Sequence, residues 1–366
     1  MPSNKLVHLL LASLVTARRP RAAQGFTLPL PMVNGSTPII ETVETVPLDG
    51  LYITEPNATS YEWWYFDVVS EDYSSSVVFV TFLTYSETGP PELSAELTIS
   101  YPNGTWTEIT IPQDELHFST TGEGSIGVAD AFFWRAAPDL SEYTIQLDVE
   151  AQGVTGEIHM SSIAPPHVKC GPAVEGASLA DAEHILWINP VPDSVASVKI
   201  GVNGTSISFK GSGYHDKNWG TNSYPDVLNQ WYWGHGRSGS YSVVFFWIIQ
   251  DNGEITASAY LAKHDQIIYS TCDPDSVVIR PFGAEGIVYP VPFNGSASLK
   301  GLYVNIDAGE DIGQFAFTAL EANVIQTDGD PSTYRRWIGS FTGGVQDSGM
   351  ENSTGFAMWE QMGPFS

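Results

Sequence analysis

The stretch YTIQLDVE, residues 143–150, alternates apolar and polar side chains without a break. Tyr143 and the three aliphatic residues after it occupy every second position, and polar residues stand between them. Because successive side chains of a β-strand point to opposite faces, this pattern predicts a strand with one face on a core and the other in water. Residues 76–85 are apolar almost throughout, which is typical of a strand buried on both faces.

Turn signals of two residues separate such runs. They are the dipeptides Asn103-Gly104, Asn203-Gly204 and Asn252-Gly253. Tight hairpin turns need positive φ at both central residues, and Asn and Gly adopt it most readily. No long segment repeats its apolar residues with a period of 3.6, although residues 179–187 fit a short helix and residues 225–229 one helical turn. The chain is therefore predicted to be all-β, a meander of antiparallel strands.

The length of 366 residues exceeds what one hydrophobic core usually serves, so two domains are expected, each a sandwich or a barrel. Gly211, Gly213 and Gly220 interrupt the strand pattern, which places the seam close to them. We assign residues 46–222 to the N-terminal domain and residues 223–366 to the C-terminal domain.

The N-terminus has the form of an export signal. Lys5 supplies positive charge, residues 6–15 are apolar, and Val15-Thr16-Ala17 resembles a small-residue cleavage site, so residues 1–17 are predicted to be a signal peptide. Residues 18–45 are Pro-rich and lack periodicity, which predicts an extended arm over the surface. The predicted location is the secretory pathway or the outside of the cell.

Six Asn-x-Ser/Thr sequons support export. They are Asn34, Asn57, Asn103, Asn203, Asn294 and Asn352. A single sequon arises easily by chance, and four of these precede Gly, where a surface turn is expected anyway. Six sequons behind an export signal nevertheless favour N-glycosylation.

The two cysteines, Cys170 and Cys272, are expected to form one disulfide in an exported chain, which would join the two halves. Neither has a partner at metal-site spacing, and no HExxH, GxSxG, Walker or GxGxxG segment is present. We therefore expect no metal, nucleotide or other cofactor. The net charge of −27 disfavours nucleic acid and anionic membranes as partners, although solubility in an acidic medium is the better explanation of this charge.

Aromatic and polar residues gather in three clusters: YEWWYF at 61–66, GYHDKNWG at 213–220 and WYWGHGR at 231–237. On a strand, alternation would place Glu62, Trp64 and Phe66 on one face and Trp63, Tyr65 and Asp67 on the other. One of these two faces must therefore bury a polar group beside an aromatic ring. Most aromatic residues of strands only form core.

The second cluster contains consecutive His215, Asp216 and Lys217, which cannot all point into an apolar core. We expect them in a glycine-flanked loop at the domain seam, where binding groups concentrate. His215 can titrate near neutrality and Asp216 could orient it, which is the minimum for proton transfer. The alternative is that Asp216 and Lys217 form a solvated turn pair.

In order and spacing, the three clusters resemble the carotenoid hydratase-like, lipocalin-like superfamily, whose hallmarks are EWWYF, YHDxNWG and WYWG. Here they read residues 62–66, 214–220 and 231–234, and the similarity spans roughly residues 50–366. The resemblance implies an N-terminal β-sandwich-like domain, a C-terminal lipocalin-like β-barrel domain and a ligand pocket between them.

The chain looks most similar to secreted fungal hetero-Diels-Alderases of meroterpenoid biosynthesis. The resemblance implies dehydration of a hydroxymethyl tropolone to an o-quinone methide, followed by [4+2] cycloaddition with a sesquiterpene such as humulene, without a cofactor. We expect His215 or Asp216 to be the acid, with Tyr232 as a weaker candidate. The residues expected to bind the substrates are Glu62, Trp64, Tyr65, Lys217, Trp219, Trp233 and His235.

Two other functions fit the same sequence. An isoprenoid hydratase or dehydratase would use the His-Asp pair to protonate an alkene, and a lipocalin-like carrier would bind an apolar metabolite unchanged. In all three cases the expected partner is a small apolar molecule rather than a nucleic acid or a membrane.

Overall fold

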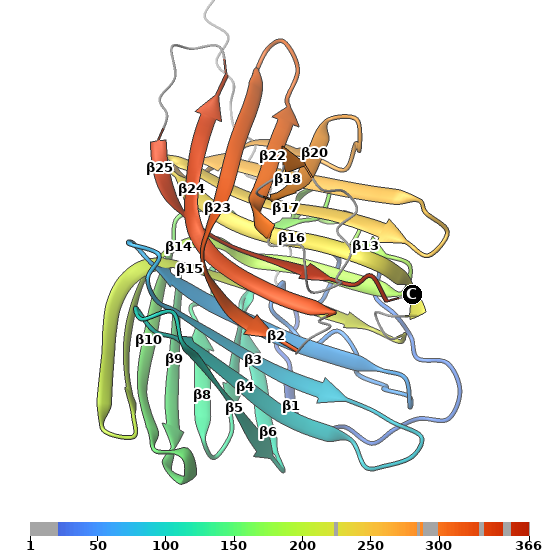
Figure 1. Cartoon of the computed structure of the whole chain (residues 1–366). Coiled ribbons are helices and arrows are strands. Elements are labelled where there is room, and N and C mark those ends of the chain that lie inside the picture. Colours follow the sequence, from blue (N-terminus) through green and yellow to red (C-terminus); the bar gives the residue numbers. More distant parts are fainter. Residues whose placement is uncertain are drawn as a thin grey trace, which may run out of the picture.

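The computed structural model describes residues 21–222, 226–283, 286–287, 299–328, 333–346 and 353–365. Apart from the short 3-10 turn η1 (Glu150–Gln152), the regular elements named for these residues are all strands. They form two antiparallel sheets, each strongly curled (Figure 1). The all-β prediction is confirmed.

The first sheet contains the N-terminal half of the chain. Its strands are β1 (Gly25–Leu28), β2 (Tyr61–Ser70), β3 (Ser76–Thr84), β4 (Glu92–Ser100), β5 (Trp106–Gln113), β6 (Leu116–Thr121), β7 (Gly124–Val128), β8 (Phe132–Ala136), β9 (Glu142–Val149), β10 (Val154–Ser162), β11 (His167–Val168), β12 (Gly171–Pro172), β13 (Ala180–Ala182), β14 (Ile185–Val202) and β15 (Thr205–Gly220). The main path runs β1-β6-β7-β8-β9-β10-β14-β15-β2-β3-β4-β5, so β2 lies between β15 and β3.

The second sheet contains the C-terminal half. Its strands are β16 (Leu228–Ser238), β17 (Tyr241–Gln250), β18 (Ile255–Lys263), β19 (Gln266–Thr271), β20 (Val277–Gly283), β21 (Gly286–Ile287), β22 (Leu299–Asp307), β23 (Gln314–Thr327), β24 (Tyr334–Val345) and β25 (Ser353–Met362). Their order is β19-β18-β17-β16-β25-β24-β23-β22-β20-β21. The chain passes from one sheet to the other between β15 and β16.

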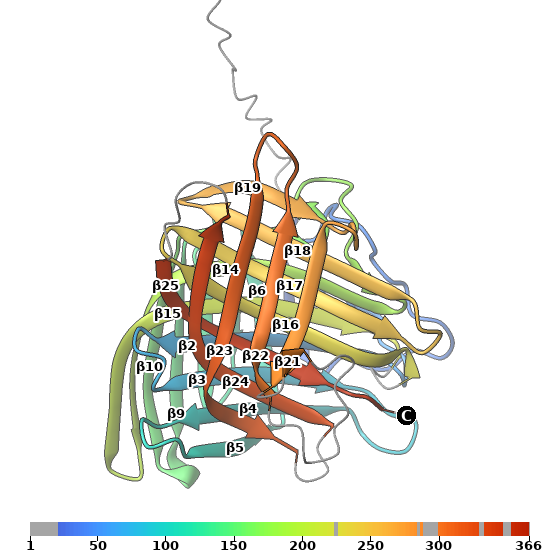
Figure 2. The same cartoon turned by 45° about the horizontal axis from the view of Figure 1, so that its top comes forward.

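Apolar side chains form three cores. One fills the curl of the first sheet and includes Trp64 and Trp134, and a second fills the curl of the second sheet and includes Trp359. The third lies between the sheets and includes Tyr214 and Trp233. In Figure 2, β16, β24 and β25 cross over β2 and β3, which is where this third core forms.

The local strand predictions are confirmed. β9 buries every second side chain, and β3 is buried on both faces. The three Asn-Gly dipeptides join β4 to β5, β14 to β15 and β17 to β18. Asn203 and Gly204 both have positive φ, 48° and 83°, as a tight hairpin turn requires.

Three local predictions were wrong. Residues 179–187 are not helical, because β13 and the start of β14 pair with each other there. The arm at 18–45 is extended in β1, as predicted, but its described part does not lie only over the surface, because β1 pairs with the edge of β6 and Leu28 and Val43 are buried in the core. Residues 213–220 are not a loop but part of β15, where the glycines allow close approach: a Cβ on Gly220 would lie 2.2 Å from the carbonyl oxygen of His184.

Cys170 and Cys272 form a disulfide that ties the segment between β11 and β12 to the end of β19, so it crosses from one sheet to the other. Of the predicted sequons, Asn34, Asn103 and Asn203 are exposed. Asn57 is half-buried, and Asn294 and Asn352 lie outside the described residues, as does the predicted signal peptide. In the described part of the chain, no helix is long and apolar enough to cross a membrane.

Candidate active site

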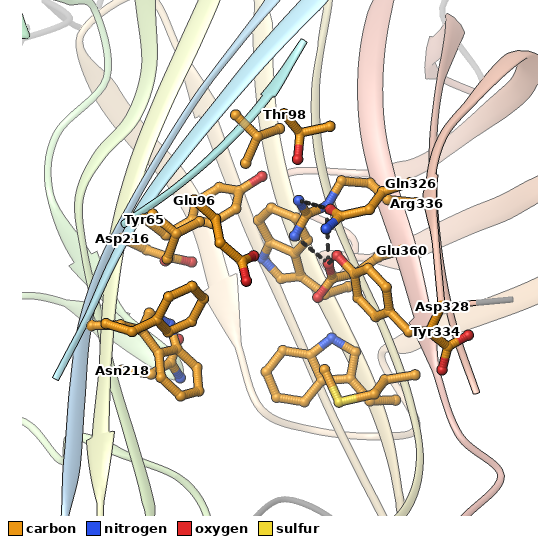
Figure 3. A pocket seen from close by; sticks show the side chains of 17 residues that line it. Tyr65, Glu96, Thr98, Asp216, Asn218, Gln326, Asp328, Tyr334, Arg336 and Glu360 are labelled. Carbon is orange, nitrogen blue, oxygen red and sulfur yellow. Dashed lines mark hydrogen bonds and ion pairs between the residues drawn. The ribbon is translucent and has the colours of Figure 1, made fainter. Parts of the chain in front are cut away.

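A cavity of about 360 Å³ lies between the two sheets, within the third core. Its lining residues are Trp63, Tyr65, Val78, Val80, Phe82, Glu96, Thr98, Asp216, Asn218, Trp231, Trp233, Gln326, Asp328, Tyr334, Arg336, Glu360 and Met362. Strands β2, β3, β4 and β15 of the first sheet supply one wall, and β16, β23, β24 and β25 of the second sheet supply most of the other (Figure 3).

Strand alternation decides which residues reach the cavity. On β2 the row of Trp63 and Tyr65 faces it, and on β15 the row of Asp216 and Asn218 does. Register places Asp216 opposite Tyr65 in the β2–β15 ladder. The cavity therefore receives a carboxyl group among aromatic rings.

Asp216 is buried, and its hydrogen bonds fall on one of its two carboxyl oxygens. Oδ2 accepts hydrogen bonds from the Trp187 indole N–H at 2.9 Å and from the Tyr214 hydroxyl at 2.8 Å. Burial away from water raises the pKa of Asp216 to about 8, helped by the charges of Glu360 and Asp67 and opposed by the two hydrogen bonds. Near neutral pH the side chain is mostly a neutral acid. The hydrogen bonds found for it among the described residues both end on Oδ2.

The opposite wall carries a polar cluster on β24 and β25 (Figure 3). Oε2 of Glu360 accepts hydrogen bonds from Arg336 Nε at 3.1 Å, Arg336 Nη2 at 2.8 Å and the Tyr334 hydroxyl at 2.8 Å. Arg336 Nη1 also donates to Gln326 Oε1 at 3.0 Å. Arg336 and Glu360 are both buried, so their charges compensate each other inside the cavity wall.

Glu96 on β4 points into the same space from the first sheet (Figure 3). Partial burial raises its pKa above the ordinary value, the negative charge of Glu108 adds to the rise, and Arg336 opposes it. The cavity thus combines two carboxyl groups of raised pKa, one compensated ion pair and a mainly apolar surface that includes several aromatic rings. Such a site can hold an apolar molecule away from water and give it a proton.

Three of the residues predicted from sequence line this cavity: Asp216, Tyr65 and Trp233. Tyr65 donates its hydroxyl to Asp67 Oδ2 at 2.9 Å, and its ring stands edge-on to Trp233, with the ring centroids 5.5 Å apart. These residues come from three strands of the two sheets.

The structure places His215 away from the cavity, which corrects its assignment as an acid. His215 is one position from Asp216 on a strand and therefore points to the opposite face, into the core of the first sheet. It stacks on Phe66 with the ring centroids 4.0 Å apart, and Nε2 lies 3.0 Å from Asp49 Oδ1. Its contacts anchor the segment around Asp49 to β15.

Four predicted substrate-binding residues also belong to that inner face. Lys217 forms a buried ion pair with Glu62 at 2.6 Å, and Glu62 accepts the backbone N–H groups of Tyr52 and Ile53. Trp64 and Trp219 are buried in the same core. Their side chains hold the first sheet together and do not reach the cavity.

Tyr232 and His235 lie elsewhere again. Tyr232 is buried in the core of the second sheet, because its neighbours Trp231 and Trp233 take the cavity face of β16. His235 lies between the sheets, where Nε2 is 2.8 Å from Asp67 Oδ2 and the ring stacks on Tyr214, but it does not line the cavity.

Sequence reasoning did not select Glu96, Tyr334, Arg336 or Glu360. Glu360 stands in the Trp359-Glu360-Gln361-Met362 segment, where a charged residue inside a strand buried on both faces is a recognisable signal. Arg336 gives a weaker signal, since it lies near the start of β24 beside another arginine. Among the described residues, no group of three or more His, Cys, Asp or Glu is arranged to hold a metal ion.

The two curled antiparallel sheets define an all-β protein with a site for a small molecule enclosed between them, lined by aromatic rings and a buried carboxyl group. The sequence profile of the family described as Diels-Alderase-like matches residues 40–277. The chain therefore belongs to the Diels-Alderase-like family and is an enzyme of that family.

Several relatives match over much of their length. The quinolone epoxide rearrangement protein asqO of Emericella nidulans is 30% identical over 362 residues, covering 94% of this chain and 96% of the relative. The quinolone epoxide rearrangement protein penF of Penicillium thymicola is 32% identical over 319 residues, covering 83% and 85%. Diels-Alderase poxQ of Penicillium oxalicum is 24% identical over 278 residues, covering 70% and 60%.

The fold matches a solved structure of a related shape. CghA, in its crystal structure with Sch210972, superposes with a TM-score of 0.73 at 16% identity, covering 88% of this chain and 94% of CghA. This likeness agrees with the two-sheet architecture described above.

Proposed function

We propose that Asp216 gives a proton to an oxygen leaving group of an apolar substrate held in the cavity, and that the resulting electrophile closes a new ring there. The observation that carries the proposal is the buried carboxyl group of Asp216, which faces an aromatic cavity and has a pKa of about 8. At pH 7 about nine-tenths of such a group carries its proton.

The cavity walls supply the second half of the catalysis. Trp63, Trp231 and Trp233 offer flat faces against which a conjugated substrate can be fixed. Holding reacting atoms in an attack geometry removes about 7–11 kcal/mol of barrier in ideal cases, and general acid catalysis contributes about 10²–10⁴-fold. Exclusion of water also protects a reactive intermediate from hydrolysis.

One substrate pair that fits is a hydroxymethyl tropolone with a sesquiterpene such as humulene. Asp216 would protonate the hydroxymethyl oxygen, the C–O bond would break with loss of water, and the tropolone hydroxyl proton would return to the carboxylate. The o-quinone methide left behind would then add to the alkene in a [4+2] cycloaddition. The Diels-Alderase-like family and relatives such as poxQ support a cycloaddition.

A second candidate is the rearrangement of an epoxide within a single substrate. It is favoured by asqO and penF, two quinolone epoxide rearrangement proteins that match most of this chain at 30% and 32% identity. Asp216 would protonate the epoxide oxygen, an internal group would attack the carbon as the C–O bond opens, and the proton that this group then loses would return to the Asp216 carboxylate. The cavity volume of about 360 Å³ lies near the lower end of ligand pockets, which suits one substrate better than two.

We also propose that the chain is exported and glycosylated. The disulfide between Cys170 and Cys272 supports passage through an oxidising compartment. The exposed positions of Asn34, Asn103 and Asn203 are compatible with attached sugars.

Purified protein incubated with each substrate set tests the function. We expect Asp216→Asn to reduce turnover by about 10²–10⁴-fold while the protein stays folded, because the amide keeps the shape of the protonated acid without its acidity. His215→Gln serves as the control, with wild-type turnover per folded molecule. Recovery of a hydrated terpene would indicate a hydratase, and recovery of unchanged ligand would indicate a carrier. Full activity of Asp216→Asn would overturn the assignment of the acid.

A further inference from the structure

The pair of Arg336 and Glu360 has unused hydrogen-bonding capacity on the cavity side. Three donors bind the same carboxylate oxygen of Glu360, Oε2. The hydrogen bonds found for Glu360 among the described residues all end on Oε2 and none on Oε1, although the residue lines the cavity. A carboxylate oxygen in that position can accept a hydrogen bond from a ligand in the cavity.

Arg336 is in the complementary situation. A guanidinium group has five N–H donors, and Arg336 uses three of them, on Glu360 and Gln326. Its guanidinium carbon lies 5.0 Å from the ring centroid of Tyr65 and 5.4 Å from that of Tyr334, so two aromatic rings help to fix it in place. Two N–H donors of a buried, fixed cation therefore remain for a ligand.

We propose that Arg336 and Glu360 bind a substrate edge that presents an N–H or O–H donor beside a carbonyl acceptor. The carbonyl oxygen would accept from Arg336, and the adjacent donor would give its hydrogen to Oε1 of Glu360. A cyclic amide has this edge, and so does a ring that carries a hydroxyl next to a ketone. The inference rests on the proposed function, because it concerns the substrate of the same cavity.

The charges of the wall exclude other ligand classes. A substrate carboxylate would meet the Glu360 carboxylate, and a substrate ammonium would meet Arg336, so either charged group is opposed by one partner. A lone alkene would leave both the Arg336 donor and the Glu360 acceptor unpaired, and an ether, which can only accept, would leave Oε1 of Glu360 unpaired; each unpaired buried group weakens binding. A neutral edge that satisfies both partners is the remaining fit.

The pair also sets the direction in which a substrate lies. Arg336 and Glu360 belong to β24 and β25 of the second sheet, whereas Asp216 belongs to β15 of the first, and the two groups face the cavity from opposite walls (Figure 3). A ring held at its carbonyl edge by the pair would point its far end toward Asp216. Binding and proton donation are thus assigned to different walls and can be tested separately.

Two matched pairs of probes test the proposal on the wild-type protein by calorimetric titration. The first pair is 4-phenylquinolin-2(1H)-one and 4-phenylcoumarin, which differ only by a ring N–H in place of a ring oxygen. The second is tropolone and 2-methoxytropone, which differ by a donor beside the ketone. A hydrogen bond to a charged group predicts that the donor-bearing member binds about ten- to hundredfold more tightly. The probe pair with the larger ratio of affinities, donor-bearing member to donor-free member, identifies whether the substrate edge is an amide or a hydroxy ketone.

Variants then localise the effect. Glu360→Gln should reduce the ratio to about threefold or less, because a neutral amide is a weaker acceptor than a carboxylate. Asp216→Asn, on the opposite wall, is the matched control and should keep the wild-type ratio even though its turnover is lost. If Asp216→Asn keeps full turnover while the affinity ratio holds, the proposed function fails and this inference stands. If the ratio is absent in the wild type, this inference fails whatever the turnover.

Equal affinity within both probe pairs would overturn the proposal, and so would an undiminished ratio in folded Glu360→Gln. The probe comparison uses the unaltered protein, so it decides the question even when removal of a buried charge prevents a variant from folding.

Discussion

Asp216 acts as an acid only while its carboxyl group carries a proton, and burial raises its pKa to about 8. Turnover should therefore stay level at lower pH and fall as the pH rises through that value. The hydroxyl of Tyr214 donates to Oδ2 at 2.8 Å and stabilises the carboxylate form. We expect Tyr214→Phe to move the falling limb of the pH profile of kcat to higher pH, as measured from about pH 6 to pH 10.

Tyr260→Phe is a suitable control for that shift. It also removes a buried hydroxyl between the sheets, but this hydroxyl donates to the carbonyl oxygen of Pro165 at 2.8 Å and not to Asp216. The limb of this variant should coincide with that of the wild type. A limb that stays in place in Tyr214→Phe, or moves equally in both variants, contradicts Asp216 as the titrating acid.

At the level of the strand, one position separates the proposed acid from a residue that stabilises the core. Asp216 faces the cavity, whereas Lys217 points to the inner core and is fully buried there with Glu62. Lys217 also donates to the carbonyl oxygen of Gly50, so it ties the segment before β2 to β15. Neighbouring residues of β15 therefore have different tasks because the side-chain period of a strand is two.

Lys217→Met should lower the free energy of unfolding by about 3–5 kcal/mol, because it leaves the Glu62 carboxylate buried without its cation. Chemical denaturation measures the loss. Turnover per folded molecule should not change, since the side chain does not line the cavity.

The double variant Glu62→Met and Lys217→Met separates charge from packing. It removes both charges, so the part of the loss that comes from an unpaired buried charge should return, while the part that comes from the backbone groups of Tyr52, Ile53 and Gly50 left without partners should remain. A fully folded Lys217→Met protein that has lost turnover would instead show that the inner row of β15 takes part in the reaction.

For the whole molecule, the decisive contact is the one between the two sheets. Asp216 comes from one sheet and Arg336 with Glu360 from the other, so the cavity exists only while the sheets are packed together. The disulfide between Cys170 and Cys272 spans this division and closes a sequence separation of 102 residues. It limits how far the unfolded halves can separate.

Replacing both cysteines with serine should lower the free energy of unfolding by about 3–5 kcal/mol, because a cross-link over 102 residues restricts the unfolded chain. Denaturation with and without a reducing agent measures the effect. The reductant should destabilise the wild type to the level of the double variant and leave that variant unchanged. A wild type that is insensitive to complete reduction would contradict this account.

Much of the local structure could be predicted from the sequence. The period of two in residues 143–150 and the Asn-Gly turns depend on neighbouring residues alone, and the structure confirms them. The glycines of residues 213–220 misled the prediction, because they signal a loop in sequence but serve close strand packing in the fold.

The site itself could be predicted only in part. Alternation showed that Glu62 and Trp63 must face opposite sides, but it could not tell which side holds the ligand. That side depends on where the second sheet packs. Arg336 and Glu360 lie more than a hundred residues beyond Asp216, and no local pattern connects them.

The sequence by itself determined the all-β class, the hairpin turns and the cluster that contains Asp216, because these follow from side-chain period and turn chemistry. Only the tertiary structure decided that Asp216 faces the cavity while His215 and Lys217 support the core, and that Arg336 and Glu360 stand opposite. The physical reason is that these side chains become buried only when the two sheets pack together and exclude water from the space between them. This burial raises the pKa of Asp216 and takes the ion pair of Arg336 and Glu360 out of water.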